Sequence, residues 1–346
     1  MANFDADGEC MKAKTKKIII FVVFLLLIAL VAVALFNIEA IIGAIGGKNN
    51  ATDAPGVSCD IDKELNTVYI DGKEYYRKKN VVNYLIMGID EFGESEERGV
   101  GQSDFLMVLS FDVVDKTYTM IPINRDTMTK VQTYDIFGEK TGERVEQIAL
   151  AHTYGNSFSV SSIDKCNNTA EAVSELLCGV EFRNYVSMTM DAVSVIVDIL
   201  GGVEVTMSED WSEIDPAYAS GATVMLDGED AMRFIRARGS LSDSSNIARM
   251  RRQNDFLEAF VKKIGMLSMN DEELLEAYDT VSPYLVSSSG ADALLEIADK
   301  VYSYSNNGTV SLPGEAKVGD RFMEFYVDEK GLVEIVTEIF FDSSYE

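Results

Sequence analysis

Short apolar runs separated by polar turns dominate the middle of the chain and predict a β-sheet. Residues 83–89, 105–114 and 118–123 are three such runs. The second run is almost wholly apolar, as expected for a central strand that is buried on both faces. Residues 67–76 read as a hairpin with Asp71-Gly72 at its turn.

Helical spacing of apolar residues follows in the second half of the chain. The apolar pattern there predicts a helix over 169–178 and a strand over 185–190. It also predicts a helix over 192–200, which Asp191 caps and Gly201-Gly202 ends, and a strand over 203–207. Further helices are expected after Leu226, from about Asn246 to Ile264, and over 271–285, 290–303 and 331–341, the last of them preceded by the apolar segment 323–327. This pattern predicts an α/β fold with α-β-α layers, in which helices cover a mixed central sheet.

The apolar segment Ile18–Phe36 predicts a transmembrane helix. At about 1.5 Å per residue it extends roughly 28 Å, which matches the hydrocarbon core of a bilayer. Lysines precede it and place residues 1–17 in the cytoplasm and the rest of the chain outside. A cleaved signal peptide is the alternative, although Asn37-Ile38-Glu39 does not resemble a small-residue cleavage site. Residues 37–80 are then an extracellular linker that carries the hairpin, with its polar part over 46–62.

Composition narrows the possible functions. The formal net charge of −27 argues against DNA binding, which depends on lysine and arginine, and against docking on an anionic membrane surface. The chain has four cysteines and one histidine. A small disulfide scaffold is excluded, and any histidine-dependent catalysis rests on His152. A lone histidine near a glycine is more often a packed structural residue.

Disulfides are permitted outside the cell, but a bridge between Cys166 and Cys178 is not expected. The segment between these residues reads as helix and holds them more than about 7 Å apart. We therefore expect Cys166 and Cys178 to be buried or unpaired thiols, whereas Cys59 is assigned no state.

An antiparallel order of the three predicted strands brings distant polar residues together. The first strand ends where the second begins, and the third returns to the same edge. Asp90, Asp104, Arg125 and Asp126 then converge there, although they are up to 36 positions apart. Two carboxylates beside an arginine can form a Mg²⁺ and phosphate site. The alternative is that these aspartates serve turns and helix caps.

Six arginines within twenty positions reverse the charge balance locally: Arg233, Arg236, Arg238, Arg249, Arg251 and Arg252. Guanidinium groups clamp phosphate oxygens in pairs, so the cluster predicts an anion site. On the helix that ends at Ile264, Arg249 and Gln253 fall in line with Phe256 and Phe260, whereas Arg251 points to the opposite side and Arg252 is intermediate. Surface ion pairing with surplus carboxylates is the alternative.

Eight short motifs together resemble the LytR-CpsA-Psr family of cell-wall enzymes, over about Asn83 to Ile264. They are Asn83-Tyr-Leu-Ile-Met-Gly-Ile-Asp90, Gly101-Gln-Ser-Asp-Phe-Leu-Met107, Ile123-Asn-Arg-Asp-Thr127, Gln147-Ile-Ala-Leu-Ala-His-Thr-Tyr-Gly155, Asp198-Ile-Leu-Gly-Gly-Val203, Leu226-Asp-Gly-Glu-Asp-Ala231, Phe234-Ile-Arg-Ala-Arg238 and Arg249-Met-Arg-Arg-Gln253.

The resemblance implies a membrane-anchored extracellular phosphotransferase. Such an enzyme moves a teichoic-acid-like or capsular glycopolymer from an undecaprenyl-pyrophosphate carrier to peptidoglycan, with Mg²⁺ as cofactor and with the polyprenyl tail in an apolar slot. Residues 81–265 would be the catalytic domain and residues 266–346 a C-terminal helical extension packed on it. The implied residue roles are Asp90 and Asp104 for the metal, Arg125, Asp126 and Arg249 for catalysis, and Arg125, Arg236, Arg238, Arg249 and Gln253 for the pyrophosphate.

The motifs depart from the common family pattern at three places. Gln102 stands where many members have arginine, Asn246 where many have aspartate, and Ala149-Leu150 where many have Asn-His. Gln102 and the Ala-Leu-Ala-His segment resemble a clostridial-type branch. A lipid pyrophosphatase without transfer and a non-enzymatic envelope protein of the transcription-attenuator type remain alternatives. The negative charge and the external domain argue against a direct DNA role.

Overall fold

A computed structural model describes residues 59–62, 67–70, 72–90, 101–135, 137–154, 161–237, 251–252, 255–256, 258–260, 262–263, 271–319 and 323–343. These residues form two compact units. Thr189–Leu285 belong to one, which we call the helical unit. The described residues up to Met188 and from Val286 onward belong to the other, which we call the sheet unit.

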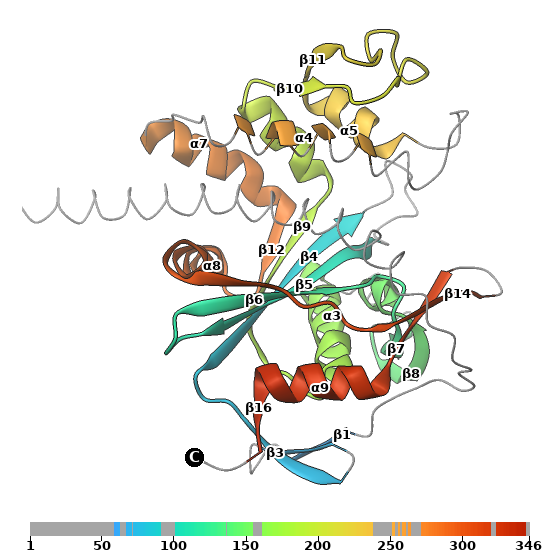
Figure 1. Ribbon diagram of the computed structural model, residues 1–346, viewed down its shortest axis with the longest axis vertical. Helices are drawn as coiled ribbons and strands as arrows, with labels where there is room; N and C mark the ends of the chain where they lie inside the picture. The colour runs from blue at the N-terminus through green and yellow to red at the C-terminus, as the bar shows by residue number, and fades with distance from the viewer. Residues whose placement is uncertain are drawn as a thin grey trace, which may run out of the picture. The chain divides into compact units, whose positions relative to one another are not determined.

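A six-stranded sheet is the centre of the sheet unit, in the order β12-β9-β4-β5-β6-β13 (Figure 1). Its strands are β4 (Val81–Asp90), β5 (Gln102–Asp112), β6 (Thr117–Ile123), β9 (Phe182–Thr189), β12 (Leu285–Ser287) and β13 (Ser305–Thr309). β4, β5 and β6 pair antiparallel, whereas β13 pairs parallel to β6. The predicted three-stranded meander and mixed sheet are confirmed.

Both faces of this sheet are buried, because nearly all central positions of β4 and β5 are apolar. On one face, Leu85, Leu106 and Val108 share a core with residues of helices α3 (Ser162–Leu176) and α9 (Glu329–Phe340). On the other face, Phe111 packs edge-on against Tyr304 at the end of α8 (Ala291–Ser303). Helices therefore lie on both sides of the sheet (Figure 1).

Helix α3 begins earlier than the apolar spacing indicated. Ser161 caps it through a reciprocal bond with Asp164, so its first turns are polar and carry no helical hydrophobic signal. Its apolar stripe, with Ala172 and Val173, falls in the second half. A lone buried thiol, Cys166, lies in the first half, as expected.

A second sheet has the order β1-β2-β3-β16, with strands Cys59–Asp62, Thr67–Ile70, Lys73–Arg77 and Phe341–Asp342. The predicted hairpin is confirmed: Ile70 pairs with Lys73, and Gly72 takes the positive φ of 75° that this short turn requires. The linker predicted over 46–62 ends in strand β1 instead of continuing as coil.

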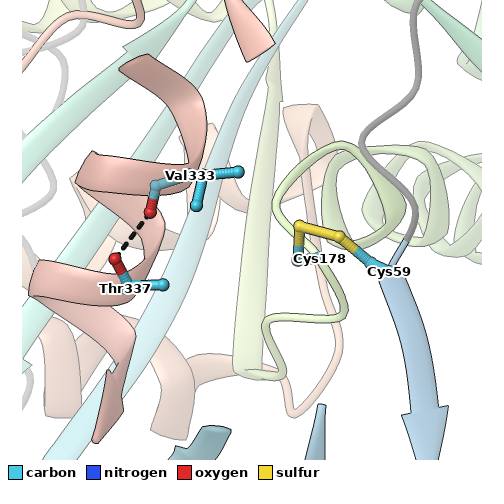
Figure 2. Close-up of a disulfide and its surroundings, with 4 residues drawn as sticks. All are labelled: Cys59, Cys178, Val333 and Thr337. Atoms are coloured by element: carbon cyan, nitrogen blue, oxygen red, sulfur yellow. Dashed lines mark hydrogen bonds between the residues drawn. A yellow bond between two sulfur atoms is a disulfide. The ribbon is translucent and has the colours of Figure 1, made fainter. Parts of the chain in front are cut away.

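The disulfide Cys59–Cys178 joins β1 to the end of α3 (Figure 2). The expectation that Cys178 is an unpaired thiol is therefore wrong, and its partner is Cys59. A helix between Cys166 and Cys178 does keep those two apart, but Cys178 follows the last turn with a positive φ of 57° and meets a strand that is distant in sequence. The Cα atoms of the bridged pair lie 5.3 Å apart, within the normal range for a disulfide.

The helical unit contains α4 (Asp191–Ile199), α5 (Gly228–Arg236) and α7 (Asp271–Val281), with the hairpin β10–β11 (Val203–Thr206 and Thr223–Leu226). Asp191 is the first residue of α4 and not its cap, so its carboxylate favours the helix through the dipole. Asp227 caps α5 by accepting from the amide of Asp230. The described residues between 251 and 263 are helical, in agreement with the predicted helix to Ile264.

Except for one turn, the remaining elements belong to the sheet unit. They are the hairpin β7–β8 (Met128–Tyr134 and Lys140–Gln147), the short helices η1 (Ile148–Leu150) and α2 (Ala151–Tyr154), and the hairpin β14–β15 (Gly314–Val318 and Met323–Val327). The turn η2 (Ser282–Tyr284), which precedes β12, belongs to the helical unit.

Residues 266–346 were predicted as a helical extension packed on the catalytic domain, but they also contain strands. Strands β12 and β13 are part of the central sheet, and Leu332, Val336 and Phe340 of α9 belong to its main core. No helix within the described ranges is long and apolar enough to cross a membrane. The transmembrane segment predicted over 18–36 lies outside those ranges.

Candidate functional site

Four of the predicted site residues come together at one end of the inner strands of the central sheet. Asp90 ends β4 and pairs with Gln102, which begins the antiparallel strand β5. β6 ends at Ile123, directly before Asn124-Arg125-Asp126. Antiparallel pairing of the three strands therefore brings Asp90, Asp104, Arg125 and Asp126 to the same end, as predicted.

A β-bulge places Asp104. Gly88 lies opposite Phe105 and Ile89 lies opposite Ser103, so Asp104 is an extra residue without a partner on β4. A Cβ atom on Gly88 would lie 2.9 Å from the Cβ of Phe105, so the strand can approach this closely only with glycine there. The bulge interrupts the regular alternation of side chains between the two faces of β5, at the end of the strand where the carboxylates lie.

Arg125 connects the carboxylates. Its Nη1 forms a salt bridge with Oδ2 of Asp104, its Nε lies 3.6 Å from Oδ1 of Asp126, and its Nη2 donates to Oε1 of Gln102 at 3.0 Å. The Arg125 side chain keeps 38% of its surface exposed. The guanidinium is thus held by three neighbours while one side stays accessible to an anion.

Asp104 has the chemistry of a metal ligand. Burial, together with the negative charges of Asp90 and Asp126, raises the pKa of Asp104 to about 6 against the opposing effect of Arg125. Its Oδ1 atom is buried and has no hydrogen-bond partner within the described residues. A buried carboxylate oxygen without a donor is costly unless a cation compensates it, so Asp104 with Asp90 nearby fits a divalent cation.

This pair supplies two ligands. Within the part of the chain that the structure describes, no three His, Cys, Asp or Glu side chains form a cluster that could hold a metal ion. Mg²⁺ usually keeps several water ligands and takes one or two carboxylates together with substrate phosphates, so two aspartates are a sufficient protein contribution.

Asp126 has a partner that the sequence motifs did not assign. Gln147, the last residue of β8, donates from Nε2 to Oδ1 of Asp126 at 2.8 Å. Burial raises the pKa of Asp126, and Arg125 opposes that rise. Gln147 begins one of the family-like motifs, but no local pattern indicates its contact with Asp126, which comes from another strand end.

The predicted arginine cluster divides into different environments. In the helical unit Arg236 is exposed at the last turn of α5. Arg233 and Arg251 form exposed ion pairs, with Asp215 and Asp230 and with Glu209, respectively. Arg238, Arg249 and Gln253 lie outside the described residues, and their predicted phosphate contacts stay predictions.

Arg252 is the most buried arginine of the cluster that the structure describes, with 1% of its surface exposed. Its guanidinium donates to the carbonyl oxygens of Phe234 and Ala237 and stacks 5.1 Å from the Trp211 ring. It therefore holds the end of α5, immediately beside Arg236. The predicted aromatic neighbours Phe256 and Phe260 are buried and stacked.

His152 is packed and not poised for catalysis. It is 3% exposed, its Nδ1 lies 2.9 Å from the carbonyl oxygen of Gly101, and burial lowers its pKa to about 4. Its Nε2 faces Sγ of Cys166 at 4.0 Å, and burial raises the pKa of that thiol to about 11. Both groups are therefore neutral near pH 7, unlike a catalytic thiolate–imidazolium pair.

One cavity of the sheet unit, of about 160 Å³, lies at the beginning of β4, at the opposite end of that strand from Asp90. Its walls include Arg77, Lys78 and Glu181 as well as apolar side chains. The charged walls do not match the apolar slot expected for a polyprenyl tail, and that slot stays a prediction.

A family model matches residues 48–340, most of the chain, and its description is the LytR_cpsA_psr family. The chain belongs to the LytR_cpsA_psr family. The match begins before the hairpin and ends in α9, beyond the segment from Asn83 to Ile264 that contains the eight motifs. It therefore includes the strands β12 and β13 that the motif-based boundaries left outside the catalytic domain.

Curated relatives and solved structures are also similar. A polyisoprenyl-teichoic acid–peptidoglycan teichoic acid transferase TagU from Oceanobacillus iheyensis is 23% identical and aligns over 92% of this chain and 91% of its own. The TagU of Halalkalibacterium halodurans is 28% identical over 53% of each chain. The crystal structure of B. subtilis TagV matches 76% of this chain and 96% of its own, with 22% identity and a TM-score of 0.49.

Proposed function

We propose that this protein transfers a glycopolymer from a polyprenyl-pyrophosphate carrier, of the undecaprenyl type, to peptidoglycan. Membership of the family supports this proposal, and relatives named teichoic acid transferases support the choice of substrate. The observation that carries this proposal is the position of Arg125 between Asp104 and Asp126 at the end of the strands, where its side chain is partly exposed.

The reaction is a phosphoryl transfer. An acceptor hydroxyl oxygen bonds to the phosphorus that carries the glycopolymer, the bond from that phosphorus to the bridging oxygen breaks, and polyprenyl phosphate leaves. Such reactions depend mainly on positioning and on neutralisation of charge. Arg125 contributes both, because its fork binds phosphate oxygens while Gln102 and Asp104 fix its orientation.

We assign Asp90 and Asp104 to a Mg²⁺ ion. The unpartnered Oδ1 of Asp104 supports this assignment. When bound, the ion neutralises charge on the pyrophosphate oxygens. Asp126 is our candidate base for the acceptor proton, because Asp104 is paired with Arg125 and assigned to the metal. Arg236, Arg238, Arg249 and Gln253 are assigned to the pyrophosphate by their places in the family motifs.

A lipid-anchored substrate explains why the enzyme would be anchored as well. Residues 18–36 would span the cell membrane, with residues 1–17 in the cytoplasm and the catalytic domain outside. The active site would then work beside the carrier lipid and the wall.

Product analysis with the purified full chain tests this function. The chain is incubated in detergent with a polyprenyl-pyrophosphate-linked glycopolymer and Mg²⁺, with and without peptidoglycan. We expect glycopolymer linked through phosphate to peptidoglycan, and loss of turnover by more than about 100-fold in Arg125→Ala and Arg249→Ala. Arg183→Ala, which removes an exposed arginine paired with Glu296, is the matched control.

Two outcomes would contradict the proposal. Release of polyprenyl phosphate without any linked product, in the presence of acceptor, would identify a pyrophosphatase. Full activity of both Arg125→Ala and Arg249→Ala would show that the site is wrong.

A further inference from the structure

Gln147 occupies a buried position between two segments that are distant in sequence. It is 7% exposed, and its Nε2 donates both to Oδ1 of Asp126 and to the carbonyl oxygen of Met323, each at 2.8 Å. A primary amide nitrogen has two hydrogens, so both are used. The amide therefore links Asp126 to the beginning of β15.

The backbone of Asp126 is already fixed without Gln147. Its amide donates to Oδ1 of Asn124 at 2.9 Å, and its carbonyl accepts from the amide of Phe325 at 2.8 Å. The remaining freedom of Asp126 is rotation of its carboxylate. Arg125 constrains that rotation weakly, because its Nε is 3.6 Å from Oδ1, beyond normal hydrogen-bond distance.

The geometry points to Gln147 as the positioning residue that aims the Asp126 carboxylate at the acceptor hydroxyl. This inference rests on the proposed function. Within the described residues, the contacts of Gln147 and of Arg125 both fall on Oδ1, so Oδ2 is the oxygen that takes the acceptor proton. A general base must be within hydrogen-bond reach of the proton it removes, so a freely rotating carboxylate slows the chemical step while the lipid substrate binds as before.

Three variants separate this role from simple packing. Gln147→Met keeps the volume but has no donor. Gln147→Lys changes the side chain but keeps donor hydrogens at its end. Gln132→Met is the matched control, because Gln132 lies in the partner strand β7 and its Nε2 donates to backbone carbonyl oxygens of Thr133 and Gly142.

Transfer kinetics with saturating peptidoglycan are measured for all variants. We expect Gln147→Met to lower kcat about 100-fold with KM for the lipid substrate changed less than about twofold, in line with a misplaced base. Gln147→Lys should recover most of kcat, and Gln132→Met should match the unsubstituted chain. Melting curves confirm that each variant is folded.

The outcomes distinguish the inference from the function on which it rests. Equal kcat in Gln147→Met and the unsubstituted chain overturns the inference and leaves the function intact. Equal loss in Gln147→Met and Gln147→Lys also overturns it, because donation would then not matter. Absence of transfer by the unsubstituted chain overturns both. If Gln147→Met does not fold, Gln147→Glu, which is nearly isosteric and has no donor when ionised, replaces it in the comparison with Gln147→Lys and is read in the same way.

Discussion

Removal of the Cys59–Cys178 disulfide should cost this protein a large part of its stability. The bridge joins residues 119 positions apart and attaches β1 to a helix end inside the main core. β1 has four residues, all of them partly or fully exposed beside its single neighbour β2, so its own packing contributes little. We therefore expect the covalent bond to be the main constraint on β1.

The length of the closed loop sets the magnitude. In the chain-entropy account, a bridge across about 120 residues removes roughly 16 cal/mol/K from the unfolded ensemble, which corresponds to about 5 kcal/mol at 25 °C. Domains of ordinary stability have only about 5–15 kcal/mol in total. The variant with Cys59→Ser and Cys178→Ser should therefore unfold at a much lower urea concentration.

Urea unfolding of the full chain in detergent, followed by far-UV circular dichroism, measures this difference. The oxidised chain, the chain with reductant and the double variant are compared, with Cys166→Ser as the control for loss of a buried thiol. Thiol counting in denaturant without reductant should find two of the four cysteines. A double variant within about 1 kcal/mol of the oxidised chain would refute the entropic reasoning, and four free thiols would refute the bridge itself.

Two further changes test the buried polar groups. Arg252→Met leaves the carbonyl oxygens of Phe234 and Ala237 without their donor, so we expect the free energy of unfolding to fall by about 2–3 kcal/mol, as measured by fluorescence of the neighbouring tryptophan. The adjacent exposed variant Arg251→Met should change it by less than about 0.5 kcal/mol, and similar losses in both would contradict the assigned role. Metal-free Asp104 keeps its proton in the folded state up to a pKa of about 6 but loses it near 3.8 when unfolded, so its contribution to stability falls as the pH rises between these values, by at most about 3 kcal/mol. Thermal unfolding in EDTA is therefore measured from pH 4 to 7 for Asp104→Asn and the unsubstituted chain. The melting temperature of Asp104→Asn should rise relative to that of the unsubstituted chain as the pH increases. A difference in melting temperature that stays constant with pH would disprove the raised pKa.

The central meander and its polar edge were predictable because their signals are local. Apolar runs define β4, β5 and β6, and antiparallel connection alone brings Asp90, Asp104 and Arg125 to one end. The bulge was not predictable, since a bulge depends on which residues of the neighbouring strand lie opposite. Gly88 was visible as a glycine, but its contact with Phe105 was not.

Non-local partners account for what the sequence reasoning missed. β13 has the sequence Ser-Asn-Asn-Gly-Thr and four exposed residues out of five, so it has no hydrophobic pattern and is a strand because β6 offers it a free edge. The Cys59–Cys178 connection and the bond from Gln147 to Asp126 likewise join residues that no spacing rule relates. Helical periodicity places Arg252 at an intermediate position, because it does not reveal the carbonyl oxygens at the end of α5 to which this arginine donates.

Asp104 is the extra residue of the bulge, so its carboxylate can be lost without changing which other residues of β4 and β5 pair. Removing a single codon there would restore uninterrupted pairing between β4 and β5, with Gly88 still opposite Phe105 and Ile89 opposite its neighbour. The shortened chain would be expected to fold at least as well, yet without the acid that Arg125 holds. A scaffold of this kind can gain or lose its chemistry through a one-residue insertion or deletion, without any change to its hydrophobic interior.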